Sequence, residues 1–110
     1  MGVVIQCNNK IIHSSYTEFE FFKNELLKAC IYYVNNKITQ NSNYNSENIK
    51  NTLYGIKLFI YNNHFCVNDS IIFLKSILCI NKFINITQNM YMLFCMFLYS
   101  VKTNSDLFIK

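Results

Sequence analysis

The chain has 110 residues, a net charge of +4 at pH 7, two Gly and no Pro. Its length fits one domain, and a hydrophobic content of 52% with ten Phe and eight Tyr excludes a disordered chain. All ten basic residues are lysines spread singly along the sequence, which disfavours nucleic-acid binding, because such proteins cluster basic side chains and use arginine.

Amino-acid usage and cysteine spacing indicate where the protein works. Asn, Lys, Ile, Phe and Tyr share A/T-rich codons, so their abundance suggests an A/T-rich genome, such as that of a large DNA virus or a protist. Five widely spaced cysteines and the lack of a secretory signal fit a reduced, intracellular compartment, which is the host cytoplasm for a viral protein. Lys75, Asn81 and Lys82 interrupt the apolar run 71–84, so we expect no membrane span.

The N-terminal third predicts a β-hairpin followed by a helix. Residues 3–6 and 10–13 favour strands around an Asn-rich turn, which tolerates the positive φ of a tight hairpin. Ser15 and Glu18 form a capping box, which starts a helix that ends at 33–35. The core face of this helix carries Phe19, Phe22, Leu26, Ala29 or Cys30, and Tyr33.

A polar surface loop is predicted at about 37–47, and Ser46 can cap a second helix after it. The second helix has an apolar seam at intervals of four, three and four residues, formed by Ile49, Leu53, Ile56 and Ile60. Residues 58–61 also fit a strand, so both structures stay open for this segment.

A third helix is predicted over residues 70–83, with Asn68 or Asp69 as its cap. Apolar residues cover most of its circumference, including Leu78. Only a narrow stripe is expected to face solvent, formed by Lys75, Ser76 and Lys82.

The fourth helix begins at Thr87 and contains the most apolar run of the chain, residues 90–101. One face has helical spacing and is typical of a core, with Met90, Leu93, Phe94, Phe97, Leu98 and Val101. The other face includes Met92, Met96 and Tyr99, which are the candidate surface for a partner or for self-association; a core role is the alternative.

Together these elements predict an α+β fold in a single domain that spans residues 1–110. About four helices make it mostly helical, with the helix at 90–101 in the centre. Residues 107–109 read as a last short strand, which joins the N-terminal hairpin in a small antiparallel sheet.

No pattern of chemically active residues is strong. Cys7, His13, His64 and Cys66 could be combined into a zinc site, and Cys66 with a histidine could form a nucleophilic pair. However, no third group that would orient the histidine is evident. Because Gly2 and Gly55 are the only glycines, a Gly-rich phosphate loop is excluded. We therefore expect no catalytic, metal-binding or cofactor-binding residues and no cofactor.

Residues 12–23 read Ile-His-Ser-Ser-Tyr-Thr-Glu-Phe-Glu-Phe-Phe-Lys, with Leu-Leu-Lys-Ala at 26–29. This pattern resembles the N-terminus of an uncharacterised family of small proteins from giant DNA viruses and bacteria, mainly over residues 11–29. The resemblance implies a strand pair, a helix, a hydrophobic segment, an acidic loop, and a last helix that runs into a C-terminal strand. At the place of the acidic loop, residues 62–67 carry no carboxylate, so no metal site is carried over.

The expected function is that of a non-enzymatic protein-interaction module. Its partner would be another protein or a second copy of the chain, and no nucleic acid is expected. The alternatives are a small membrane-associated protein and a Cys/His-dependent enzyme.

Overall fold

Four helices and one four-stranded antiparallel sheet form an α+β fold, as the sequence predicted. The structure is a computed structural model, and it describes residues 2–40 and 46–110. The described elements are β1 (Gly2–Cys7), β2 (Lys10–Ser15), α1 (Tyr16–Gln40), α2 (Ser46–Tyr61), β3 (His64–Phe65), α3 (Val67–Ile80), the 3-10 helix η1 (Asn81–Phe83), α4 (Gln88–Thr103) and β4 (Leu107–Ile109).

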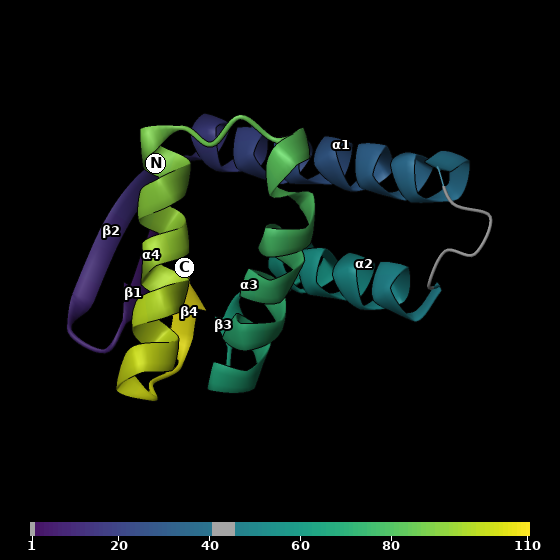
Figure 1. Ribbon diagram of the computed structural model, residues 1–110. Coiled ribbons are helices and arrows are strands. Elements are labelled where there is room, and N and C mark those ends of the chain that lie inside the picture. Colours follow the sequence, from purple (N-terminus) through teal and green to yellow (C-terminus); the bar gives the residue numbers. More distant parts are fainter. Residues whose placement is uncertain (1, 41–45) are drawn as a thin grey trace.

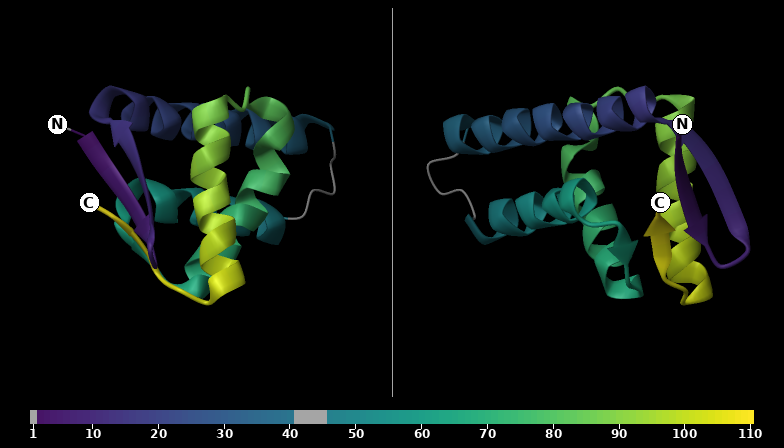
Figure 2. Two further views of the ribbon diagram at one scale, coloured as in Figure 1. Left: turned by 90° about the vertical axis from the view of Figure 1, so that its left-hand side faces the viewer. Right: turned by 180° about the vertical axis from the view of Figure 1, so that it is seen from behind.

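The molecule is elongated, with extents of 47 × 29 × 21 Å. Helices α1 and α2 lie side by side as a hairpin and extend past α3 toward one end, while the sheet and α4 lie at the other end (Figures 1 and 2). Along the far half of this hairpin the neighbouring elements are α3 and η1, as in the contact between the Tyr33 and Phe83 rings. We call α1 and α2 together the helix hairpin below.

The sheet has the strand order β2-β1-β4-β3. The predicted N-terminal hairpin is confirmed, and Asn8 supplies the positive φ of 56° in its turn. The C-terminal strand β4 pairs with β1, also as predicted, through Cys7 opposite Leu107. It also pairs with the two-residue strand β3, which the sequence did not predict. The C-terminus is therefore held between two segments that are distant in sequence.

Helix α1 begins as predicted but ends later. The Glu18 N–H donates to Ser15 Oγ at 3.1 Å, which confirms the cap. The Glu18 carboxylate, however, accepts hydrogen bonds from Ser14 Oγ and from Asn89 Nδ2. The predicted end at 33–35 is wrong, because asparagine costs little inside a helix and the Thr39 hydroxyl bonds the Asn35 carbonyl at 2.8 Å.

The boundaries predicted for the polar loop are also corrected. Residues 37–40 belong to α1 and residues 46–47 to α2, while 41–45 lie outside the described residues. The strand alternative for 58–61 is wrong, because α2 continues to Tyr61. Of the predicted seam only Ile56 is fully buried; the buried side of α2 also includes Thr52, Gly55, Leu58 and Phe59.

Helix α3 differs from its prediction at both ends. Its N-cap is Cys66, and Asp69 sits at the third position and accepts the Cys66 N–H at 3.3 Å. The α-helix ends at Ile80, and η1 continues it. The predicted solvent stripe is wrong at one position, because Ser76 is 2% exposed while Leu78 is 71% exposed. Ser76 packs against Gly55 of α2, where only small residues fit.

Phenylalanine rings fill the centre of the core. The ring of Phe97 on α4 lies 4.5, 5.1 and 6.1 Å from those of Phe73, Phe65 and Phe59. The Thr87 hydroxyl caps α4 as predicted, by accepting the Met90 N–H at 3.2 Å. The aromatic pairs around Phe97 add stabilisation beyond their buried area. Helix α4 thus contributes a ring to the centre of the core, but the helix itself packs on α3 and the sheet at one end of the molecule, so the prediction that the other helices surround it is not confirmed.

None of the helices in the described part of the chain is both long enough and apolar enough to cross a membrane.

Candidate functional site

The three residues predicted as a partner surface on α4 do not share one exposed surface. Met92 is 45% exposed, but Met96 is 3% exposed and belongs to the core. Tyr99 is half-buried; its hydroxyl donates to Asn9 Oδ1 at 3.1 Å, and the Lys10 Nζ lies 4.8 Å from its ring centre. The alternative core role therefore holds for Met96, and Tyr99 is engaged by the β1–β2 turn. Only Met92 is left on the surface.

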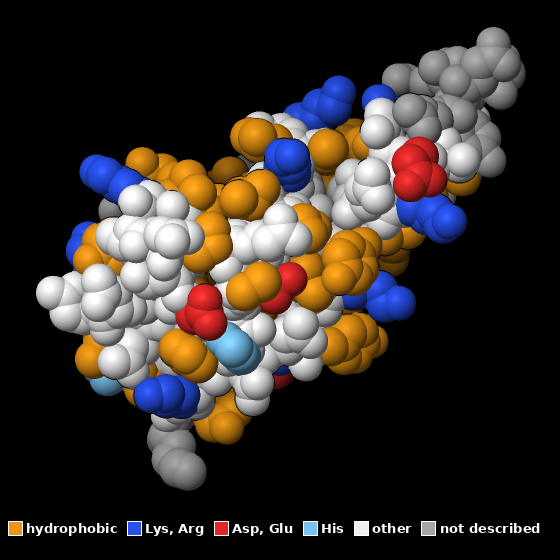
Figure 3. Space-filling view, turned by 90° about the horizontal axis from the view of Figure 1, so that it is seen from below, with side chains coloured by type: hydrophobic (Ala, Val, Ile, Leu, Met, Phe, Trp, Pro, Cys, Tyr) orange, Lys and Arg blue, Asp and Glu red, His pale blue; other side chains and the backbone are white. Residues whose placement is uncertain are grey.

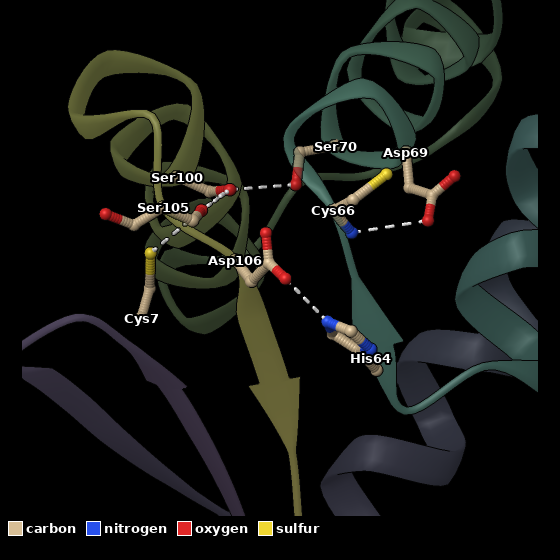
Figure 4. A network of polar contacts seen from close by, with 8 residues as sticks. All are labelled: Cys7, His64, Cys66, Asp69, Ser70, Ser100, Ser105 and Asp106. Carbon is tan, nitrogen blue, oxygen red and sulfur yellow. Dashed lines mark hydrogen bonds and ion pairs between the residues drawn. The ribbon is translucent and has the colours of Figure 1, made fainter.

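A network of polar side chains lies where the C-terminal end of α4 meets the start of α3 (Figure 4). The Ser100 hydroxyl donates to the Ser105 carbonyl at 2.6 Å, so the hydrogen in its 3.1 Å contact with Ser70 comes from Ser70. The Cys7 thiol also donates to the Ser105 carbonyl, and burial raises the pKa of this thiol. These bonds satisfy buried polar groups and fix the turn that precedes β4.

The same turn places Asp106 against His64. Asp106 Oδ2 lies 2.8 Å from His64 Nε2, and both side chains are about half exposed. The imidazole also stacks on the Phe108 ring, with centroids 4.6 Å apart and an interplanar angle of 6°. Asp106 is therefore the group that orients this histidine, which the sequence analysis did not find. No local pattern in the sequence points to this contact, because it depends on the pairing of His64 with Phe108 across β3 and β4.

The histidine is oriented, but the thiol is not directed to it. Cys66 lies at the start of α3 beside Asp69, while the His64 ring turns toward Asp106 (Figure 4). Among the described residues, no hydrogen bond joins the Cys66 thiol to His64. No group of three or more potential metal ligands occurs in the described ranges. The combination of Cys7, His13, His64 and Cys66 is thus not brought together.

A second apolar stripe on α1, distinct from its core face, is the main exposed feature of the helix hairpin. Leu27, Ile31, Val34 and Ile38 recur at intervals of four, three and four residues. Leu27, Ile31 and Ile38 are exposed, with Ile31 at 59%, and Val34 is half-buried. This spacing produces an apolar seam along one side of a helix, which is the pattern through which helices pack on one another.

Helix α2 carries a matching stripe. Of its predicted seam Leu53 is exposed, while Ile49 and Ile60 are half-buried and also pack against the core. Around the helix axis they lie about 120–160° from Gly55, the residue that contacts α3. On α1, Ile31 and Ile38 lie about 140–160° from Tyr33, whose ring contacts Phe83 of η1. Both stripes therefore face away from α3 and η1.

We call these two stripes the hairpin face, which comprises Leu27, Ile31, Val34, Ile38, Ile49, Leu53 and Ile60. Seen from behind, α1 and α2 face the viewer, and no other described helix or strand covers them (Figure 2). The underside of the molecule, a different side from the hairpin face, carries charged side chains singly or in small groups among hydrophobic ones (Figure 3). Two adjacent helices with parallel apolar seams can accept further helices, as in a helical bundle.

Comparisons with known protein families, with curated proteins and with solved structures gave no match to this chain. The resemblance over residues 11–29 to small proteins of giant DNA viruses and bacteria therefore stays a prediction.

Proposed function

We propose that this protein is a non-enzymatic interaction module that binds through the hairpin face. The observation that carries the proposal is the row of exposed aliphatic side chains on α1, at the spacing with which helices pack. Scattered exposed apolar residues are normal, but a contiguous apolar patch on a monomer marks an interaction site. The proposal moves the partner surface from Met92, Met96 and Tyr99 of α4 to the helix hairpin.

The occupant that fits best is the hairpin face of a second copy. Closed oligomers most often form by a two-fold contact between identical patches, and such a patch must complement itself. Two helix hairpins stacked face to face give a four-helix arrangement, which buries both seams of each copy. The second copy would then cover each stripe from end to end. On α1 this is the stripe from Leu27 to Ile38, and on α2 it is the stripe from Ile49 to Ile60.

The test is the mass in solution, measured by size exclusion with light scattering in reducing buffer without detergent. We expect the wild type to have twice the chain mass of 13.1 kDa. The variant Ile31→Glu/Leu53→Glu should be monomeric, because it places four charges in the contact of a dimer. Both positions are exposed within helices, so the fold should change in stability by less than about 0.5 kcal/mol per site.

Two matched variants on α4 separate this surface from the one first predicted. Met92→Glu and Leu98→Glu introduce the same charge at exposed apolar positions of another helix, and both should remain dimeric. A wild type that is monomeric at all concentrations would contradict the proposal. A dimer that persists in Ile31→Glu/Leu53→Glu but dissociates in Met92→Glu would return the interface to α4.

The polar cluster around His64 supports a structural rather than a catalytic role. Its members bond mainly to one another and to the turn before β4, as far as the described residues go. A nucleophile activated by a histidine requires the two side chains within hydrogen-bond reach. The non-enzymatic part of the proposal rests on the thiol of Cys66 lying at the start of α3, away from the oriented His64 ring.

A further inference from the structure

A groove of about 890 Å³ lies on the side of the helix hairpin opposite the hairpin face. It is enclosed by the second half of α1, the first half of α2 and the end of α3 with η1. Its volume falls in the range of roughly 300–1,000 Å³ that is typical of small-molecule sites. The hairpin face does not take part in it, so the groove can be occupied independently of any partner there.

The charges around this groove all have one sign. Lys37 comes from α1, Lys75 from α3 and Lys82 from η1, so three separate elements each contribute an ammonium group. Among the described residues that line it, none is Asp or Glu. Glu20 and Glu25 of α1 form ion pairs with Lys23 and Lys28, which do not line the groove. A concave site lined by one sign of charge concentrates ions of the other sign.

The helix dipole accounts for the positions of only two of these three lysines. Lys37 lies in the last turn of α1 and Lys82 follows α3, where cations interact favourably with the helix dipole. Their Nζ atoms each lie 5.7 Å from the ring centres of Tyr33 and Phe83, which also line the groove. Lys75, in contrast, lies more than one turn before the end of α3. The dipole therefore gives no reason for Lys75 to face this groove.

The remaining lining adds hydrogen-bond donors and one accessible ring. Asn36, Asn51 and Asn81 bring side-chain amides from three sides, and the exposed ring of Tyr54 borders the opening. We propose that the groove binds a small organic polyphosphate, with the three lysines at its phosphate groups and Tyr54 beside its organic part. Since the chain has no Gly-rich loop, side chains rather than backbone amides would hold the phosphates.

Two exposed cysteines allow a direct test on the intact protein. Cys79 lines the groove, whereas Cys66 is exposed at the opposite end of α3 and does not line it. The rate at which a maleimide labels each thiol is followed by mass spectrometry, with and without ATP. We expect ATP to slow the labelling of Cys79 by roughly tenfold at saturation and to leave Cys66 unchanged, because a bound ligand covers only the first thiol.

Further probes identify what the groove recognises. Protection by inorganic triphosphate equal to that by ATP would support the proposal and assign binding to the phosphates alone. Stronger protection by ATP would support it and add a role for the Tyr54 ring. Equal protection by adenosine, which has no phosphate, would overturn it, and so would the absence of protection by both ATP and triphosphate.

Lysine variants provide the matched control. Lys75→Gln should weaken ATP binding by roughly tenfold, because it removes one charge-assisted contact. Lys57→Gln changes an exposed lysine of α2 that does not line the groove, and it should leave the affinity unchanged. Equal effects of the two substitutions would mean that the affinity for ATP depends on the net charge of the protein rather than on this groove. That result would contradict the proposal. Circular dichroism of both variants verifies that they fold.

Discussion

Cys30 shows how one residue of α1 ties the stability of the protein to pH. Its thiol lies in the core face of α1, and burial raises its pKa from the ordinary value of 9.0 to about 11. In the unfolded chain the thiol ionises near its ordinary pKa, while in the folded protein it keeps its proton. The unfolded state thus binds fewer protons between these two values, so stability decreases as the pH rises through this window.

We predict that raising the pH from 8 to 10.5 lowers the free energy of unfolding by roughly 2 kcal/mol through this thiol. The measurement is urea unfolding followed by circular dichroism at both pH values, in reducing buffer. Cys30→Ala removes the titrating group, so its stability should fall less over the same interval. An equal fall in the variant and the wild type would show that other groups cause the pH dependence.

At the scale of elements, the contact between α2 and α3 depends on two small residues. A Cβ on Gly55 would overlap the Ser76 hydroxyl and would lie 2.9 Å from the Ile72 carbonyl oxygen. The Ser76 hydroxyl bonds the same carbonyl at 3.2 Å, so it is satisfied within its own helix and can be buried. The two helices approach more closely here than larger side chains would permit.

We predict that Gly55→Ala destabilises the protein by about 1–3 kcal/mol, although alanine favours helix by about 1 kcal/mol over glycine. The new methyl group meets the backbone of α3, which cannot move without separating the helices. Thermal or urea unfolding measures the effect. As a control, Leu78→Ala on the exposed side of α3 should change stability by less than about 0.5 kcal/mol. A Gly55→Ala variant as stable as the wild type would show that this contact can relax.

At the scale of the whole molecule, β4 joins the two ends of the chain to its middle. It lies between β1 and β3, and its Leu107 is completely buried. The backbone of Lys110 exchanges hydrogen bonds with Val4, and the Ile109 N–H donates to the Asn63 carbonyl at 2.8 Å. The last residues therefore bond to segments that lie 46 and 106 positions earlier in the sequence.

We predict that Leu107→Ala lowers the free energy of unfolding by about 2–4 kcal/mol, because it leaves a cavity under the sheet. Phe108→Ala, one position along the same strand, should cost less than about 1 kcal/mol, since that ring lies on the exposed face. Urea unfolding of the two variants gives the comparison. Equal costs would mean that β4 contributes through its backbone pairing and not through its buried side chain.

The sequence by itself determined the elements whose signals are local. The Asn-rich turn at Asn8, the Ser15 cap and the Thr87 cap each act within a few residues, and all three form as predicted. The α+β class followed from these signals together with the apolar run of α4. Where a helix ends was less predictable, because Asn35 opposes α1 only weakly and packing decides the outcome.

Only the tertiary structure decided which apolar or small residues are buried, and hence where the candidate sites lie. Sequence showed a polar Ser76 and an apolar Leu78, yet their burial is reversed because Gly55 lies opposite the first. The sequence predicted the core face of α1, but not that Leu27, Ile31 and Ile38, which lie outside that face, would form a second, exposed stripe. Periodicity reports that a helix has an apolar side, whereas the partner of that side is set by contacts between residues distant in the chain.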